Sequence, residues 1–361
     1  MSDFLGDFLG DFLIVRLAAA GDVLLTTALA HALRRARPQS QIAWLTSRYA
    51  APLLAGNPDV DTVLAAPTPG PGLAAQARAL AALASTGSAL SLYSWRRRHP
   101  QATVLLAHRS LKLRALLRLA GFRRIVAWGR EAPFELEQHR LAQLGALLQA
   151  AGVAAGGDSG AAADLRPQLH LEAAERADGA AAWGAAPAGA PRWVLAPGGA
   201  GNPWARMPNR RWAPERFGTL ARRARAEGIV VRWVGGPGDR DVIARSAPDL
   251  PAAAIDAATR SSLREMAAVI AAADVVIGND SLPLIMAQAL GRPGLGLYGP
   301  TAGAFIHAPG QAFVQGEAGC GPCYDPRRGV RGQAYTCGRA RCMEQISAAA
   351  VWQLALKVHH G

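Results

Sequence analysis

Short apolar runs alternate with longer amphipathic stretches along almost the whole chain. The apolar runs are rich in Val, Ile, Leu and Trp, which is typical of strands buried on both faces. The runs that predict strands are Phe12–Leu17, Gln41–Thr46, Val60–Leu64, Thr103–Ala107, Arg124–Trp128, Arg192–Ala196, Ile229–Val234, Val275–Gly278 and Leu295–Tyr298. Helical periodicity predicts Asp22–Ala36, Leu73–Leu83, Leu111–Ala120, Glu137–Ala151, Ser262–Ala273 and Ala348–His359, and helices that begin near Pro214 and Pro283. This alternation predicts an α/β fold with parallel sheets covered on both faces.

A shift in composition divides the pattern in two. The region from Gly152 to Pro191 is dominated by Ala, Gly and Pro, and its last part, Gly184–Pro191, is typical of an interdomain linker. A chain of 361 residues is long enough for two domains, at about 100–200 residues each. We predict a first domain over 1–185, a second over 186–343 and a helical segment over 344–361.

The charge balance favours an anionic partner. Lys and Arg number 39 against 26 acidic residues, a formal charge of +13. This charge suits nucleotide phosphate, nucleic acid or a phosphate-bearing membrane surface, although Arg-rich codon usage explains it equally well. No apolar run approaches the roughly 20 residues of a membrane span, and the N-terminus carries a small repeat over Asp3–Leu13 where a signal peptide would have a basic region. We expect a cytoplasmic protein with reduced or metal-bound cysteines.

Asp22 is the first candidate for chemistry. It stands where the first predicted strand turns into the first helix, and such a turn lies at the edge where open α/β sheets bind ligands. A carboxylate there is either a general base or a helix cap. After the Thr103–Ala107 strand come His108, a candidate pocket residue, and the basic residues Arg109 and Lys112. These two fit a groove for a phosphorylated acceptor or a solvated face.

The second half of the chain contains a pattern suited to phosphate. Gly198 and Gly199 follow a strand, so backbone N–H groups can approach a phosphate closely. Arg210 precedes a helix start, and a guanidinium donates bidentately to diphosphate. Asp239 lies in the loop after another strand, as an N-cap or as a partner for ribose hydroxyls.

A second polar turn follows the strand Val275–Gly278. Asn279, Asp280 and Ser281 come directly after this strand and precede a helix. Polar side chains and free helix N–H donors are thereby placed where the helix dipole favours a phosphate. The alternative for Asp280 is a simple N-cap.

Together these pieces resemble the ADP-heptose:lipopolysaccharide heptosyltransferase family. The resemblance spans nearly the whole chain and rests on modest motifs that are specific in combination. They are R-x-x-x-x-G-D-V at Arg16–Val23, N-P-x-V-D at Asn57–Asp61, the Pro197–Gly199 turn, R-R-W-x-P-x-x-F at Arg210–Phe217, N-D-S-x-P at Asn279–Pro283 and G-R-P-x-x-x-L-Y-G-P-T at Gly291–Thr301.

The resemblance implies a GT-B fold, with two Rossmann-like domains facing each other across a cleft and the C-terminal helix crossing back to the first domain. It implies an inverting glycosyltransferase that needs no cofactor for catalysis and uses Asp22 as its base. The donor, ADP-heptose by resemblance, would contact Gly198, Gly199, Arg210, Asp239, Ser261, Asn279, Asp280, Ser281 and Leu282. The acceptor would be a lipopolysaccharide core or a similar anionic glycan or glycolipid, met by Arg109 and Lys112, with peripheral contact to the inner membrane.

Some positions depart from the family pattern. Leu282 and Ile285 stand where relatives often carry a glycine and a histidine, and Ala18–Ala20 replace hydroxyl residues before the Gly-Asp pair. Polar contacts to both sugars are therefore fewer. Another nucleotide sugar or a protein acceptor remains an alternative.

Four cysteines, the full number in the chain, fall in the segment 320–342. Their spacing is C-x2-C, thirteen residues, then C-x4-C: Cys320, Cys323, Cys337 and Cys342. Tetrahedral thiolate coordination fits such pairs, so we predict a structural zinc or iron; disulfides or free thiols are the alternatives.

Two other classes of protein fit the sequence less well than a transferase does. A nucleic-acid-binding protein with a zinc ribbon needs a basic stripe with interleaved aromatics, but aromatic residues make up 6% of the chain, so we expect no nucleic acid partner. A dinucleotide oxidoreductase needs G-x-G-x-x-G after the first strand, where this chain has AAAGD.

Overall fold

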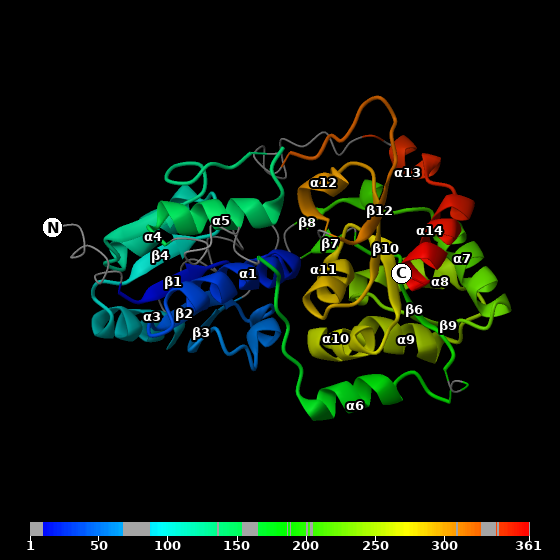
Figure 1. The fold of residues 1–361 in the computed structure, drawn as a ribbon, viewed down its shortest axis with the longest axis horizontal. Helices are drawn as coiled ribbons and strands as arrows, with labels where there is room; N and C mark the ends of the chain where they lie inside the picture. Colours follow the sequence, from blue (N-terminus) through cyan, green and yellow to red (C-terminus); the bar gives the residue numbers. More distant parts are fainter. Residues whose placement is uncertain are drawn as a thin grey trace. The chain divides into compact units, whose positions relative to one another are not determined.

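A computed structural model describes residues 10–67, 87–135, 137–153, 165–185, 187, 189–199, 201–202, 205–307, 310–325, 337 and 339–360. The chain forms two compact units, Met1–His170 and Leu171–Gly361 (Figure 1). Each predicted strand is present, with its ends shifted by at most two residues. The helix predicted over Leu73–Leu83 lies outside the described residues.

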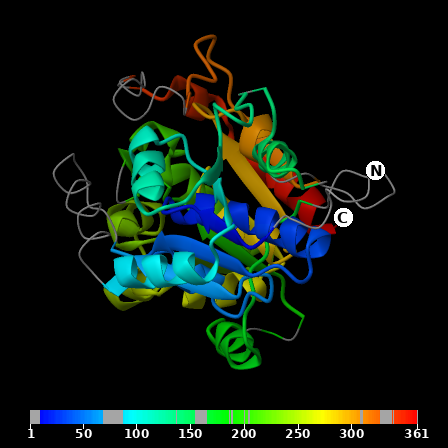
Figure 2. The same cartoon turned by 90° about the vertical axis from the view of Figure 1, so that its left-hand side faces the viewer.

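Unit 1 is a five-stranded parallel sheet in the order β3-β2-β1-β4-β5. Its strands are β1 (Phe12–Val15), β2 (Ile42–Ser47), β3 (Thr62–Ala66), β4 (Thr103–Leu106) and β5 (Arg124–Ala127). Its helices are α1 (Ala20–Ala36), α3 (Gly87–Arg98), α4 (Leu111–Leu119) and α5 (Arg140–Ala150), with a 3-10 turn at Ala51–Leu54, and helices lie on both sides of the sheet (Figures 1 and 2). The chain order reverses between β1 and β4, so the carboxyl ends of these two strands form the expected ligand site.

Unit 2 is a second five-stranded parallel sheet in the order β12-β11-β10-β6-β9. Its strands are β6 (Arg192–Ala196), β9 (Val230–Trp233), β10 (Val275–Asn279), β11 (Gly294–Tyr298) and β12 (Ala312–Gln315), with a small hairpin of β7 (Gly201–Asn202) and β8 (Ala205–Arg206). Its helices are α6 (Ala173–Ala181), α7 (Pro214–Ala226), α8 (Arg240–Ser246), α9 (Ala252–Arg260), α10 (Leu263–Ala271), α11 (Leu282–Ala289), α12 (Gly303–Ile306), α13 (Arg341–Gln345) and α14 (Ala348–His360). Here the order reverses between β6 and β10, which places the expected site at their carboxyl ends.

The boundary between the units lies earlier than the predicted 185/186. Helix α6 packs on α10, where Trp183 donates its indole N–H to the Val269 carbonyl at 3.2 Å and Glu175 pairs with Arg264. Gly179 lies directly against the Ala268 backbone, where a Cβ would clash at 2.2 Å. These contacts make the residues after His170 part of unit 2.

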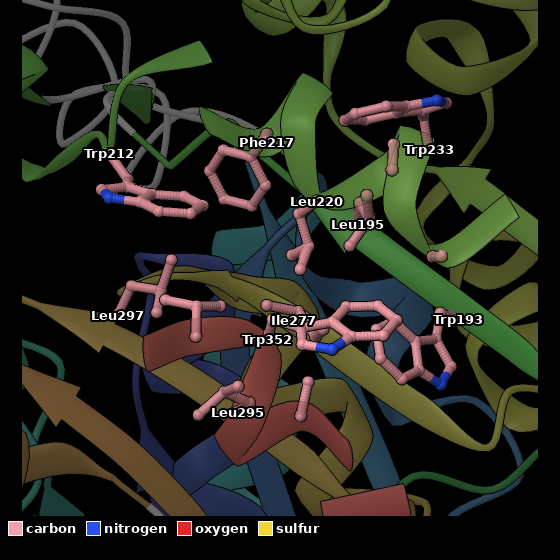
Figure 3. Close-up of a cluster of buried hydrophobic side chains, with 14 of the residues drawn as sticks. Trp193, Leu195, Trp212, Phe217, Leu220, Trp233, Ile277, Leu295, Leu297 and Trp352 are labelled. Atoms are coloured by element: carbon pink, nitrogen blue, oxygen red, sulfur yellow. The ribbon is translucent and has the colours of Figure 1, made fainter. Parts of the chain in front are cut away.

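Helix α14 is also part of unit 2, whereas the resemblance implied that it crosses back to the first domain. Its Trp352 is buried against Trp193 of β6, with ring centroids 5.5 Å apart (Figure 3). Arg223 of α7 lies 4.6 Å from the centroid of the Trp352 ring. Val351 and Ala355 are fully buried in the same cluster. The apolar side of α14 therefore completes the core of its own unit.

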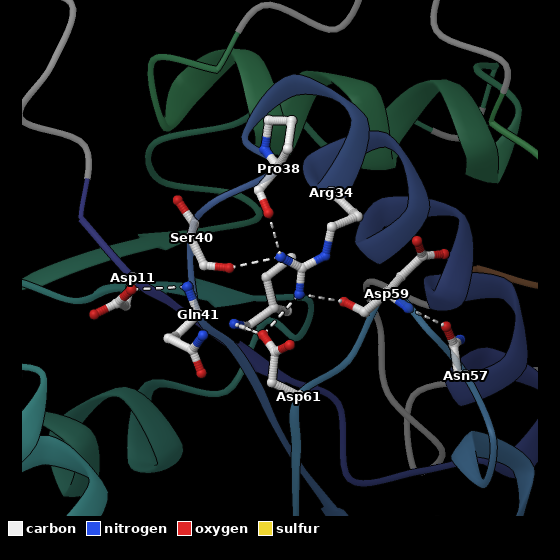
Figure 4. Close-up of polar contacts among 9 residues, drawn as sticks. Asp11, Arg34, Pro38, Ser40, Gln41, Asn57, Asp59 and Asp61 are labelled. Atoms are coloured by element: carbon white, nitrogen blue, oxygen red, sulfur yellow. Dashed lines mark hydrogen bonds and ion pairs between the residues drawn. The ribbon is translucent and has the colours of Figure 1, made fainter.

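The Asn57–Asp61 motif has a structural role in unit 1 (Figure 4). Asp61 accepts from Arg34 Nη2 at 2.6 Å and from the first amide of β2 at 2.7 Å. Arg34, in the last turn of α1, also donates through Nη1 to the carbonyls of Pro38 (2.9 Å) and Ser40 (2.7 Å). The motif thereby ties the end of α1 to the start of the next strand.

Within the described residues, no helix has the length and apolar character needed to span a bilayer.

Candidate active site

The carboxylate of Asp22 lies in the first turn of α1, at the carboxyl end of β1. Its Oδ1 accepts from Arg140 Nη2 at 3.0 Å, and its Oδ2 pairs with Arg16 and accepts from the Ala19 amide at 3.3 Å. The Asp22 side chain is 27% exposed, while those of Arg16 and Arg140 are 10% and 9% exposed. The carboxylate is therefore fixed from two sides and still reachable by a ligand. Asp22 caps the start of α1 through the Ala19 amide and also forms the two ion pairs. A role as helix cap and a role as general base therefore do not exclude each other.

Electrostatics keep this carboxylate ionised. Burial by itself raises the pKa of Asp22, but the charges of Arg16 and Arg140, with hydrogen bonds from Arg16 and Ala19, outweigh it, and the pKa is lowered. His108, which follows β4, lies in the same field. Burial and the two guanidiniums lower its pKa to about 4 against the attraction of Asp22, so its imidazole is neutral at pH 7. Its Nδ1 is buried without a hydrogen-bond partner among the described residues.

Aromatic rings hold Arg140 in place. Its guanidinium lies 4.9 Å from the centroid of the Trp128 ring and 5.4 Å from that of Phe134. Arg109, one of the two predicted acceptor residues, lies 5.4 Å over the same Phe134 ring. Lys112 is exposed on α4. We call Arg16, Asp22, His108 and Arg140 the Asp22 cluster.

In unit 2, the glycine-rich turn after β6 and the polar turn after β10 are in contact. A Cβ on Gly199, whose φ is +95°, would lie 2.7 Å from the Ser281 Cβ, and one on Gly198 would overlap the Asp239 carboxylate at 2.3–2.6 Å. Both positions therefore require glycine. Asp239 also accepts from Arg211 at 2.8 Å and from the Gly236 amide at 3.0 Å.

Asn279 positions this turn through the backbone. Its Nδ2 donates to the carbonyls of Pro197 and Gly198, each at 2.9 Å, and its Oδ1 accepts from the Trp212 amide at 2.9 Å. The side chain is fully buried. Because both amide hydrogens are used within the turn, Asn279 fixes the shape of the turn, and its contact with the donor stays a prediction.

Asp280 and Arg210 form a buried ion pair at this edge, with 3.1 Å between Oδ2 and Nη1 and side chains 9% and 10% exposed. The Arg210 guanidinium lies 4.3 Å over the Tyr324 ring. Tyr298 is a neighbour that the sequence did not single out. Burial, and then Asp280, raise its pKa well above the usual value, and its hydroxyl hydrogen-bonds His307 Nδ1 at 3.0 Å.

Two further predicted donor residues are Leu282 and Ser261. Leu282 begins α11 and is half-buried. Ser261 lines a half-open cavity of about 870 Å³ between β9, α6, α9 and α10, whose lining includes Trp183, Val231 and Ala258. None of the other predicted donor residues lines this cavity.

The four cysteines are free thiols, and only Cys342 is buried. Burial, and then the charges of Cys337 and Cys320, raise the pKa of Cys323, while burial, Cys323 and Cys337 raise that of Cys342. The thiols are therefore within electrostatic reach of one another, and their chemistry fits zinc or iron. Within the described part of the chain, however, no three potential ligands are close enough to hold a metal.

Similarities to known proteins agree with this architecture. The family model "Glycosyltransferase family 9 (heptosyltransferase)" matches residues 161–325, whereas no curated protein matches the chain in sequence. A family 9 glycosyltransferase from Veillonella parvula superposes with a TM-score of 0.71 at 18% identity, over 97% of each chain. ADP-heptose lipopolysaccharide heptosyltransferase II of E. coli gives 0.69 at 19%, over 97% of this chain and 98% of its own.

A third neighbour carries a metal. The iron-containing dodecameric glycosyltransferase TibC of E. coli gives a TM-score of 0.56 at 14% identity, over 98% of this chain and 77% of its own. The predicted α/β fold with two Rossmann-like units, the resemblance to the heptosyltransferases and the prediction of an enzyme are confirmed.

Proposed function

We propose that the chain is a glycosyltransferase of the heptosyltransferase family that transfers heptose from ADP-heptose to a lipopolysaccharide core or similar anionic glycan, with inversion at the anomeric carbon. The observation that carries this proposal is the ion-paired and partly exposed carboxylate of Asp22 at the carboxyl end of β1. Two structures of one E. coli heptosyltransferase, WaaC, contain ADP and ADP-2-deoxy-2-fluoro heptose, which supports the choice of donor.

In the proposed reaction, Asp22 takes the proton of an acceptor hydroxyl as that oxygen attacks the anomeric carbon. The new bond is oxygen to carbon, the bond to the diphosphate oxygen breaks, and its electron pair leaves with ADP. A positioned general base contributes about 10²–10⁴-fold to such a step. An ionised base is required, and the two guanidiniums beside Asp22 keep it so.

Unit 2 supplies the groups for the leaving diphosphate. The backbone of Gly198 and Gly199 and the start of α11 at Ser281 offer N–H donors, and Arg210 offers a positive charge, all of which stabilise developing negative charge. We assign Asp239 to the ribose hydroxyls, Asp280 to the donor sugar or diphosphate through Arg210, and the loop around Ser261 to the nucleobase of the donor.

Arg109 and Lys112 are our candidates for the anionic acceptor. Arg109 shares the Phe134 ring with Arg140, which links it to the Asp22 cluster. We also propose a cytoplasmic location with peripheral contact to the inner membrane, which cell fractionation and flotation with anionic vesicles test. If the protein is recovered neither in the membrane fraction of lysed cells nor with the floating anionic vesicles, the membrane contact is contradicted.

We further propose that Cys320, Cys323, Cys337 and Cys342 hold a structural zinc or iron. Support comes from the four-thiol donor set, the influence of these thiols on one another and the iron of the TibC neighbour. Such a metal would contribute to folding and would leave catalysis to the protein side chains. Elemental analysis of protein purified without chelators should find one metal per chain. Less than a tenth of that amount would contradict the proposal.

The decisive experiment measures transfer from ADP-heptose in wild type and in Asp22→Asn. We expect turnover to fall about 10²–10⁴-fold, since the amide cannot accept the proton, while calorimetry shows unchanged ADP binding. Full turnover of Asp22→Asn would remove Asp22 as the base. Tight binding of a UDP- or GDP-sugar in place of ADP-heptose would change the donor and leave the enzyme class intact.

A further inference from the structure

Arg140 reaches Asp22 from far along the chain. It is the first residue of α5, whereas Asp22 lies in the first turn of α1. Its Nη2 donates to Oδ1, and Arg16 pairs with Oδ2. The two arginines therefore fix different oxygens, so neither duplicates the other.

The guanidinium of Arg140 is oriented before any ligand arrives. It packs on the faces of Trp128 and Phe134, whose own rings meet edge to face with centroids 5.5 Å apart. The Trp128 indole is fixed in turn by donating to the Gln143 carbonyl of α5 at 2.9 Å. A planar guanidinium stacks on aromatic faces and keeps its fork free for a carboxylate, which an ammonium cannot do.

From this geometry we propose that Arg140 is the positioning residue of Asp22: the ring-held guanidinium fixes the orientation and the charge of the carboxylate that acts as the base. The inference rests on the proposed role of Asp22 as the base. Among the described residues, the charged or titratable groups that face Asp22 are Arg16 from the end of β1, Arg140 from α5 and the neutral His108 from the end of β4. Of these, Arg140 packs on two aromatic rings.

The test is the pH dependence of kcat/KM in Arg140→Met, Arg140→Lys and wild type. Removal of a neighbouring positive charge should raise the pKa of the base, so the acidic limb should move about one to three pH units upward in Arg140→Met. In Arg140→Lys the limb should stay near that of wild type, while kcat falls because the ammonium does not hold the orientation. Arg118→Met, an exposed arginine of α4, is the matched control and should keep the wild-type profile.

Donor binding and thermal unfolding of each variant separate positioning from folding. If Arg140→Met does not fold, Arg140→Lys and Phe134→Leu carry the test: each should lower kcat at unchanged ADP affinity. An acidic limb in Arg140→Met that coincides with that of wild type, or unchanged kcat in Arg140→Lys and Phe134→Leu, would overturn the inference. The proposed function fails by a different result, namely transfer by Asp22→Asn at the wild-type rate.

Discussion

The two ends of helix α1 each carry an arginine–aspartate network, and they differ in what the arginine meets. In the last turn, Arg34 donates to backbone carbonyls of the loop that follows and to Asp61. In the first turn, Asp22 is held by two side chains, Arg16 and Arg140, and keeps an exposed fraction of 27%. The same pair of residue types thus fixes the course of the chain at one end and presents a partly exposed carboxylate at the other.

The largest difference between the two ends is expected in turnover. Asp22→Asn removes the base and should lower kcat about 10²–10⁴-fold, whereas Asp61→Asn should keep kcat and lower the stability of unit 1. Steady-state kinetics and denaturant unfolding of both variants make the comparison. A loss of turnover in Asp61→Asn at full folding would show that the two ends are not functionally separate.

Stability should be lost mainly at the last turn. Arg34→Met removes the guanidinium that donates to the Asp61 carboxylate and to the Pro38 and Ser40 carbonyls. Because these bonds are partly exposed, the loss should be about 0.5–1.5 kcal/mol. Urea unfolding measures this loss, with Arg118→Met as an exposed control. A free energy of unfolding within error of wild type would mean that water replaces the guanidinium.

The pH dependence should come from the first turn. Because the folded pKa of Asp22 is lowered, its ion pairs contribute stability above the unfolded pKa of about 3.9, and this contribution disappears as the pH falls through the folded value. The stability difference between wild type and Asp22→Asn should therefore shrink between pH 6 and pH 3. A difference that stays constant over this range would contradict the ion-paired state.

The smallest effect concerns a third arginine–aspartate pair, Arg210 and Asp280 of unit 2. As with Arg140 beside Asp22, an aromatic ring packs on the guanidinium of this pair. Tyr324→Ala removes that ring, and a cation–π contact of about 0.5–1 kcal/mol predicts ADP binding weakened about 2–5-fold. Calorimetry measures the affinity, and Tyr324→Phe is the control that retains the ring. Equal affinity in both variants would leave Tyr324 without a role at the donor.

The sequence predicted nine of the ten strands of the two parallel sheets, missing β12, and it predicted the turns after β1, β6 and β10, because each depends on neighbours in the chain. Periodicity and Gly or Asp at strand ends are local signals. His108 was a candidate for the same reason, since it follows a strand whose carboxyl end faces the site. In the sheet β1 and β4 are neighbours, and no local pattern in the sequence predicts this strand order.

Arg140 was missed because it lies 118 residues from Asp22 and looks like any arginine at a helix start. The domain boundary was misplaced for a related reason. Composition marks the Ala-, Gly- and Pro-rich stretch after Trp183, but packing of α6 on α10 decides to which unit the helix belongs. Similarly, the amphipathic pattern of α14 predicts a helix but not the sheet it covers.

The burial of Trp352 against Trp193 has a consequence for synthesis on the ribosome. The core of unit 2 joins β6, near its beginning, to α14, which is translated after every strand of the sheet. All five described strands of unit 1 have been translated by Ala127, so the core of unit 1 can close while unit 2 is still being synthesised. Until α14 emerges from the ribosome, the sheet of unit 2 exposes the apolar face that α14 covers. That face is the one that nascent-chain chaperones would meet.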